Sequence, residues 1–253
     1  MRSLRRCFKP VSSIVALLLL SSALRAEEVC PVEIKLLISP STIKSVLASL
    51  SFAKRAEGQV YFFDTDNLAL LKQGVIVRIR QGTKNDLTIK VRLPEDNKQT
   101  NGSRLREQFG CEIDRTGVGA NTSFSVRQKF RHRRVPETGD DIFGTLNAHQ
   151  RRLLQEAQVS IDWSVVRRTA SINSTTWETA TQSPFHKLTL EYWECPAGNI
   201  LELSARVTSN ESESKYADLQ QIVNAKALVP SANQGTKTSL ALRSLTSVAS
   251  PPR

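Results

Sequence analysis

The sequence predicts an α+β fold in which an antiparallel β-sheet is accompanied by helices. Six segments alternate apolar and polar side chains with the period of two that is typical of strands. Other segments carry apolar side chains at helical spacing. The chain has 253 residues, of which 40% are hydrophobic and 23% charged, so it is long enough to bury a core of its own.

The beginning of the chain has the pattern of a secretory signal peptide. Residues 1–26 combine a basic start, a short apolar run and small residues, and cleavage after Ala23 or after Ala26 fits this pattern. The apolar run is well short of the ~20 residues that cross a bilayer, so we expect no transmembrane segment after cleavage. We therefore expect a secreted or periplasmic protein, with a domain at 27–246 and a frayed tail at 247–253.

Composition narrows the classes of function. The chain holds 35 Lys and Arg against 24 Asp and Glu, and five of the bases lie in the signal segment, which leaves 30 bases against the same 24 acids. This modest excess predicts no specific nucleic-acid partner. The chain lacks Cys-x-x-Cys, His-Glu-x-x-His and Gly-x-Ser-x-Gly, so zinc fingers, zincin proteases and nucleophile-elbow hydrolases are poor candidates.

After cleavage Cys30, Cys111 and Cys195 remain, and the sequence does not say which two form a disulfide.

The elements follow in chain order. The alternating segments predict strands at 32–36, 75–80, 87–92, 106–114, 188–194 and 201–207, and a further strand is expected at 159–169. Helices are expected at 39–52, 66–72, 147–158 and 213–228. The polar stretches 93–105 and 116–140 are predicted to be mobile loops. The second stretch contains Arg131-His132-Arg133-Arg134, a basic run that is either simply solvated or steers an anion.

The polar faces of the predicted strands are unusually rich in charge. Their bases are Lys35, Arg78, Arg80, Lys90, Arg92, Arg106 and Arg206, and their acids are Glu33, Glu112, Asp114, Glu191 and Glu202. Two interpretations remain open: the charged face lies in water, or the sheet curls into a barrel and these side chains line a tunnel. In a tunnel, arginines would hold a polyanion and carboxylates a hard cation such as magnesium.

Several short motifs occur together in a recognisable order. They are Val32-Glu33-Ile34-Lys35, Tyr61-Phe62-Phe63-Asp64-Thr65, Gly74, Arg78-Ile79-Arg80, Thr88-Ile89-Lys90, Glu112-Ile113-Asp114, Glu191-Tyr192-Trp193, Leu201-Glu202-Leu203-Ser204 and Thr236-Lys237-Thr238. In this order the chain resembles CYTH domains, the triphosphate tunnel metalloenzymes. The resemblance extends over about residues 29–246.

The resemblance implies a closed antiparallel eight-stranded barrel with a charged tunnel and flanking helices. It also implies binding of a phosphorylated polyanion with magnesium or manganese, because family members hydrolyse inorganic triphosphate, thiamine triphosphate or RNA 5′-triphosphate, or cyclise ATP. By matching position, the expected substrate ligands are Lys35, Arg78, Arg80, Lys90, Arg92 and Arg168. Arg167 is an alternative to Arg168 if a bulge shifts the strand. The expected metal ligands are Glu33, Glu112, Asp114 and Glu202, and Lys35 and Glu112 are the expected catalytic residues.

The chain departs from the family pattern at three acidic positions, one of which is Asp114, an acid one methylene shorter than the expected Glu. Pro31 stands where the opening motif has its first acid, and Ser204 ends the last acidic pair. Fewer carboxylates weaken the capture of a cation. Two functions therefore remain: a metal-dependent hydrolase of phosphoanhydride bonds, or a barrel that binds a polyanion or a partner without catalysis. A purely structural role is a third, weaker alternative.

Overall fold

A computed structural model describes residues 30–82, 84–93, 101–179 and 184–248. The predicted signal peptide at 1–26 lies outside the described residues. In the part of the chain that the structure describes, no helix is both long and apolar enough to cross a membrane.

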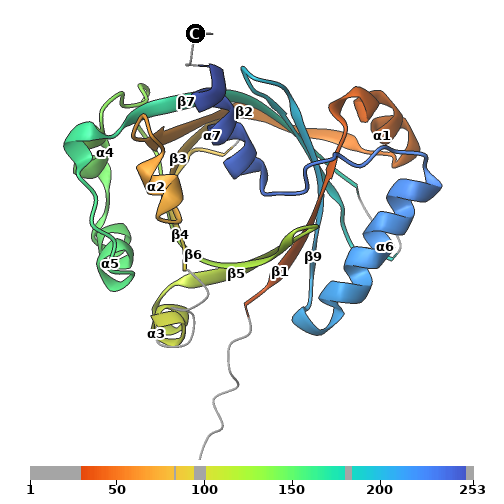
Figure 1. Ribbon diagram of the computed structural model, residues 1–253, viewed down its shortest axis with the longest axis horizontal. Helices are drawn as coiled ribbons and strands as arrows, with labels where there is room; N and C mark the ends of the chain where they lie inside the picture. Colours follow the sequence, from red (N-terminus) through yellow and green to blue (C-terminus); the bar gives the residue numbers. More distant parts are fainter. Residues whose placement is uncertain (1–29, 83, 94–100, 180–183, 249–253) are drawn as a thin grey trace, which may run out of the picture.

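Nine strands close into a barrel, seen along its opening in Figure 1. Their order around the barrel is β1-β5-β6-β4-β3-β2-β7-β8-β9, and β9 pairs with β1. The strands are β1 Val32–Ile38, β2 Ala53–Asp64, β3 Val75–Gly82, β4 Asp86–Arg92, β5 Gly110–Thr116, β6 Gly119–Lys129, β7 Arg167–Glu178, β8 Thr189–Glu194 and β9 Ile200–Val207.

The predicted closed barrel is confirmed, but two of its details differ. The barrel has nine strands rather than eight, and β1 pairs with β5 in parallel, whereas every other pairing in it is antiparallel. Strand β6 occupies much of 116–140, which was wrongly predicted to be a mobile loop. Its inward positions are mostly small and polar, such as Ser123 and Ser125, so the stretch resembled a loop in composition.

Two strand boundaries were also predicted wrongly. The expected strand at 106–114 begins only at Gly110, because helix α3 (Asn101–Gln108) precedes it. Arg106 therefore lies on a helix and not on the tunnel wall. The strand expected at 159–169 is β7, which begins at Arg167 and continues to Glu178.

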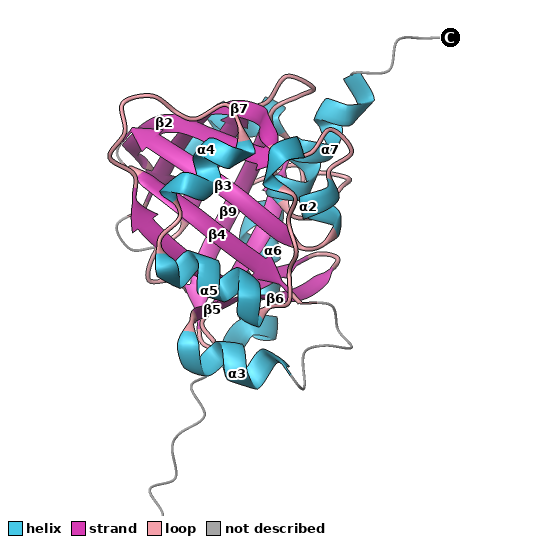
Figure 2. Cartoon of the chain, turned by 90° about the vertical axis from the view of Figure 1, so that its left-hand side faces the viewer, coloured by secondary structure: helices cyan, strands magenta, loops and turns pink. Residues whose placement is uncertain are grey.

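The helices pack on the outside of the barrel, except for one at its end (Figures 1 and 2). They are α1 Ile43–Ser49, α2 Ala69–Lys72, α4 Gly139–Thr145, α5 Ala148–Glu156, α6 Ser212–Ala225 and α7 Lys237–Val248, in addition to α3. Short 3-10 turns lie at Pro40–Thr42, Trp163–Val165 and Ser209–Glu211.

The alternation of the strands sorts apolar from charged side chains. The outward apolar residues of β3, β4 and β6 pack with Leu153 and Leu154 of α5, and those of β1 and β9 pack with Leu219 and Val223 of α6. Burial of these apolar faces drives closure of the sheet. Their polar neighbours consequently face the interior of the barrel.

An apolar cluster fills one end of that interior. Phe62, Ile172 and Trp193 from the strands meet Ala241 and Leu242 from α7. Helix α7 therefore caps the barrel at this end, as Figure 1 shows. The first residue of the helix, Lys237, reaches toward the polar part of the interior.

A disulfide between Cys30 and Cys111 spans the parallel pairing that closes the barrel. The register of β1 and β5 contains only three residue pairs, fewer than any other pairing in the barrel. Next to it the amide of Ile113 donates a 2.9 Å hydrogen bond to the carbonyl of Pro31. The covalent link thus supports the shortest pairing, and Cys195 is buried and free.

Candidate functional site

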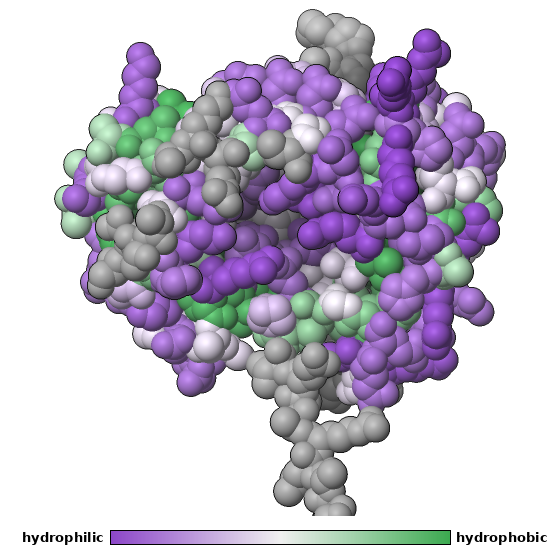
Figure 3. Space-filling view, turned by 180° about the vertical axis from the view of Figure 1, so that it is seen from behind, coloured by the Kyte–Doolittle hydropathy of each residue, from purple (hydrophilic) through white to green (hydrophobic). Residues whose placement is uncertain are grey.

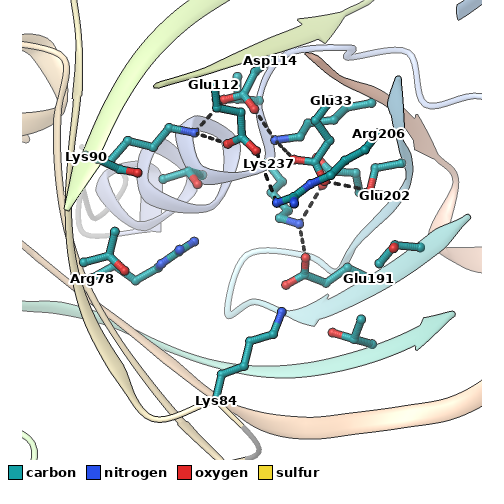
Figure 4. A pocket seen from close by; sticks show the side chains of 18 of the residues that line it. Glu33, Arg78, Lys84, Lys90, Glu112, Asp114, Glu191, Glu202, Arg206 and Lys237 are labelled. Atoms are coloured by element: carbon teal, nitrogen blue, oxygen red, sulfur yellow. Dashed lines mark hydrogen bonds and ion pairs between the residues drawn. The ribbon is translucent and has the colours of Figure 1, made fainter. Parts of the chain in front are cut away.

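The interior of the barrel contains a highly charged cavity of about 540 Å³. In Figure 3 one face of the molecule is hollowed, with hydrophilic side chains around the hollow, and Figure 4 shows charged side chains converging from several strands. The lining of the cavity includes ten bases, which are Lys35, Arg78, Arg80, Lys84, Lys90, Arg92, Arg127, Lys187, Arg206 and Lys237. It includes six acids, which are Glu33, Glu112, Asp114, Glu178, Glu191 and Glu202. The lining therefore carries a formal net charge of +4.

The structure brings all but one of the predicted site residues into this cavity. Those on its wall are Glu33, Lys35, Arg78, Arg80, Lys90, Arg92, Glu112, Asp114 and Glu202. Arg168 is the exception. It shares the outer face with Phe63, opposite which it lies, forms an ion pair of 2.7 Å with Glu137 and stacks over the ring of Tyr61.

A β-bulge explains the position of Arg168. The register of β2 and β7 shifts between Phe62 and Phe63, so Thr169 is an extra residue between Ala170 and Arg168. A bulge inserts one residue and reverses the face of everything beyond it. Ala170 faces the interior, whereas Arg168 faces outward. Arg167, the alternative, is exposed and pairs with Asp66, away from the cavity lining.

Three carboxylates meet on β1 and β5. One oxygen from each of Glu33, Glu112 and Asp114 lies within 4.8 Å of the other two. The arrangement follows from the parallel register, which places Glu33 beside Asp114, and from alternation, which puts Glu112 on the same face. We refer to these three residues as the acidic triad.

Two lysines form ion pairs with the acidic triad. Lys35 Nζ lies 2.9 Å from Glu33 and also contacts Asp114. Lys90 Nζ lies 2.9 Å from Asp114 and 3.2 Å from Glu112. Lys35 lies on β1, which also carries Glu33, and Lys90 lies on β4, the second strand from β5 in the barrel.

Burial and the neighbouring charges shift the pKa values of Lys35 and Asp114 in opposite directions. Burial alone would lower the pKa of Lys35, but Glu33, Asp114 and the more distant carboxylates outweigh it and raise the pKa. Burial would likewise raise the pKa of Asp114, but Lys35 and Lys90 hold it well below its usual range. At neutral pH Lys35 is therefore a fixed positive charge and Asp114 a fixed negative one.

The acidic triad fits a hard divalent cation by its chemistry. It offers carboxylate oxygens, the ligands that magnesium and manganese prefer, on one face of two paired strands. Glu202, also predicted as a ligand, is not in this group and instead pairs with Lys237 at 2.7 Å. Ser204 donates a 3.3 Å hydrogen bond to Glu33, so it positions one of the triad carboxylates.

Lys237 forms a second charged cluster at the capped end. It contacts Glu191 and Glu202 and lies 5.0 Å above the ring of Trp193. The indole of Trp193 donates a 2.7 Å hydrogen bond to Glu191. Burial raises the pKa of Glu191 but Lys237 outweighs it, and the net effect is a pKa of about 2.

The opposite wall, on β3 and β4, is dominated by bases. Arg80 donates to Asp86 through Nε at 3.0 Å and through Nη2 at 2.5 Å, and Arg127 Nε lies 3.7 Å from the same carboxylate. Arg78 has no hydrogen bond or ion pair with any residue that the structure describes, and its Nε is buried. Burial, followed by repulsion from Arg80, lowers the pKa of Arg78 to about 10.

Gly74 helps to place Arg92 on this wall. The glycine has φ +77° and its carbonyl accepts a 2.9 Å hydrogen bond from the amide of Arg92. A Cβ on Gly74 would lie only 2.4 Å from the carbonyl oxygen of Arg92. The close approach of the two chains therefore requires glycine here.

Several charged residues of the site are not predicted from sequence, and they are Lys84, Asp86, Arg127, Glu178, Lys187 and Lys237. Asp86 and Lys84 lie just before the predicted strand at 87–92, and extending its alternation by one residue would have found Asp86. Arg127 lies on β6, in the stretch taken for a loop. Lys237 belongs to the motif Thr236-Lys237-Thr238, but it lies on a helix, where period-two alternation does not assign it to the tunnel wall.

Comparison with known proteins agrees with this architecture. The CYTH domain family model matches residues 31–219. A solved structure from Hippeastrum, described as an adenylyl cyclase candidate with a dominant triphosphatase activity, aligns with a TM-score of 0.58 at 18% identity, over 84% of this chain and 94% of its own. An adenylate cyclase candidate from Bacillus halodurans aligns with a TM-score of 0.55 at 15% identity, over 83% and 96%. At these identities the likeness shows the fold, and no curated protein sequence matches.

Proposed function

The chain belongs to the CYTH domain family, and on that premise we propose that its tunnel binds a phosphorylated polyanion and hydrolyses a phosphoanhydride bond in it. Tripolyphosphate or an organic triphosphate has the size and charge for this cavity. The observation that carries the proposal is Arg78 on the tunnel wall, whose buried Nε has no hydrogen-bond partner among the residues that the structure describes.

An anion would complete the environment of Arg78. A buried charge without a partner is unfavourable, and a buried donor without an acceptor costs about 1–3 kcal/mol. Phosphate oxygens match the planar donors of arginine, and Arg80 and Arg92 supply further guanidinium groups on the same wall. The net charge of +4 in the lining also favours a ligand with several negative charges.

The proposed reaction needs charge stabilisation more than a covalent catalyst. Water adds to the terminal phosphorus, the bridging P–O bond breaks, and the products are orthophosphate and a chain shortened by one phosphate, with the proton passing to solvent. Charge spreads over the phosphoryl oxygens in the transition state. Arg78 and the protonated Lys35 would stabilise that charge. Because its pKa is raised, Lys35 acts as a cation here and not as a general base.

The acidic triad would hold a divalent cation, which supplies Lewis-acid stabilisation of phosphate oxygens when bound. Lys35 and Lys90 would then turn from the carboxylates toward the phosphates. Their long flexible side chains allow this exchange of partners.

We infer that the protein acts outside the cytoplasm. The predicted signal peptide supports this, and so does the disulfide between Cys30 and Cys111, because disulfides persist in oxidising compartments. Inorganic polyphosphates suit such a location better than nucleoside triphosphates.

Binding without hydrolysis is the second candidate. The ion pairs of Lys35 and Lys90 with the acidic triad favour it, since they compete with a cation for the same carboxylates. Pro31 and Ser204, which offer no carboxylate, act in the same direction.

An experiment with purified mature protein and tripolyphosphate distinguishes hydrolysis from binding without hydrolysis. Phosphate release is measured with magnesium, with manganese and with a chelator, and binding is measured by calorimetry in the chelator. Arg78→Gln should weaken binding about tenfold or more, whereas Arg152→Gln, on the outer face of α5, should not. Metal-dependent release supports hydrolysis, and binding without release supports the second candidate. If wild-type protein does not bind tripolyphosphate, the proposal is wrong.

A further inference from the structure

A row of bases leads out of the tunnel along the end of β6, beginning with Arg127, which lies near Asp86. Arg127 lines the cavity, yet 59% of its side chain is exposed, so it lies at an opening. Lys129 follows two residues later and lies opposite Asp86, a residue that shares the tunnel face with Arg80. The same face of the strand thus carries positive charge from inside the cavity to outside it.

The basic run Arg131-His132-Arg133-Arg134 continues this row. The amide of Phe130 donates a 3.0 Å hydrogen bond to the carbonyl of Asn85, and Gln81 donates to the carbonyl of His132 at 3.4 Å. These contacts hold the start of the run beside the turn between β3 and β4. Lys84, which lines the cavity, lies on that turn. We call Lys129, Arg131, Arg133 and Arg134 the exit track.

The bases of the exit track are available to a ligand. All four residues are exposed, and none forms an ion pair with a residue that the structure describes. Two acids close to the exit track are engaged elsewhere. Asp86, which lies opposite Lys129, pairs with Arg80, and Glu137, three residues after Arg134, pairs with Arg168. Arg127 and Lys129 lie about 7 Å apart on one face of β6, and Arg131 follows two residues beyond the end of the strand, so the bases continue along the chain away from the cavity.

We propose that the exit track binds the distal part of a linear inorganic polyphosphate whose terminal phosphates occupy the tunnel. The inference rests on the proposed function and deepens it, because it assigns chains longer than three phosphates as the preferred ligand. A line of bases that continues from the cavity fits a narrow chain of repeated charge. His132 is the aromatic side chain in this run, and it already packs against Phe130, which favours a phosphate chain over nucleic-acid bases that need several stacking rings.

The test compares two ligands and two charge-matched variants. Binding of tripolyphosphate and of long-chain polyphosphate is measured by calorimetry in a chelator, which prevents turnover. The track variant is Arg131→Gln/Arg133→Gln/Arg134→Gln. The control variant is Lys44→Gln/Lys72→Gln/Lys226→Gln, which removes three exposed charges from other surfaces. Thermal unfolding checks that both variants fold.

We expect the track variant to lose about tenfold in affinity for long-chain polyphosphate and to bind tripolyphosphate within about twofold of wild type. The control variant should change neither affinity by more than about twofold. Equal losses for both ligands, equal losses in both variants, or equally tight binding of single-stranded RNA would each overturn the inference while leaving the tunnel proposal intact. Failure of wild-type protein to bind tripolyphosphate would overturn both.

Discussion

The ammonium group of Lys237 donates a 2.7 Å hydrogen bond to the carboxylate of Glu202, across 35 residues of sequence. The bond joins the capping helix α7 to β9 inside the barrel. Only 13% of the lysine side chain and 4% of the glutamate side chain are exposed. This contact joins helix α7 to the tunnel wall, and its contribution to stability can be measured.

Replacement of Lys237 by Met should destabilise the protein by roughly 3 kcal/mol, because two carboxylates would lose their shared cation in a buried site. Urea denaturation measures the change in the free energy of unfolding. Lys226→Met, which changes an exposed lysine, is the control and should cost less than about 0.5 kcal/mol. A similar loss in both variants would show that the buried position of Lys237 is irrelevant.

Stability should fall as the solution becomes acidic. The folded pKa of Glu191 is about 2, below its ordinary value of 4.5, so its contribution is complete above pH 4.5 and is lost as the pH falls toward 2. Asp114, whose folded pKa is also lowered, acts in the same direction. We expect the free energy of unfolding to decrease between about pH 5 and about pH 2. In Lys237→Met this decrease should be smaller, and an unchanged decrease would contradict the assignment to Glu191.

Loss of the disulfide should weaken the closure of the barrel. The Cys30→Ala/Cys111→Ala variant removes a link across 81 residues, and loop-closure entropy predicts a loss of roughly 4 kcal/mol. Hydrogen exchange at the amide of Ile113 should become faster, since that amide belongs to the short pairing of β1 with β5. Reductant should lower the melting temperature of wild type and leave that of the variant unchanged.

Neutralising Glu112 should separate hydrolysis from binding. Glu112→Gln removes one carboxylate of the acidic triad, and metal-dependent release of phosphate should fall by about 100-fold or more. Binding of tripolyphosphate in a chelator should stay equal or become tighter, because a negative charge has left the cavity. Glu156→Gln, on the outer end of α5, is a matched control. Unchanged release in Glu112→Gln would mean that the acidic triad is not the metal site.

The Arg168→Gln variant tests whether the β-bulge turns this side chain away from the ligand. Arg168→Gln should leave binding of tripolyphosphate within about twofold of wild type, because the side chain lies on the outer face with Glu137 and Tyr61. The lost surface ion pair should cost less than about 1 kcal/mol. A loss of binding as large as that in Arg78→Gln would show that Arg168 reaches the ligand.

Much of the tunnel wall could be predicted from sequence, because the side of a strand on which a side chain lies depends only on its neighbours in the chain. In β1, β3 and β4 the period of two places Lys35, Arg78 and Lys90 on the face opposite the apolar residues. The same rule failed where local geometry changes. Thr169 in its bulge reversed the face of Arg168, and the small polar residues of β6 concealed a strand and its Arg127.

The sequence by itself therefore determined which side chains face the interior on most strands, because alternation depends only on neighbouring residues. The tertiary structure decided which charges meet. Glu33 joins Glu112 and Asp114 because β1 pairs in parallel with β5, and Glu202 pairs with Lys237 because α7 caps the barrel. The buried Nε of Arg78 is left without a partner among the described residues. These contacts depend on strand order, register and closure, which bring together residues far apart in the chain.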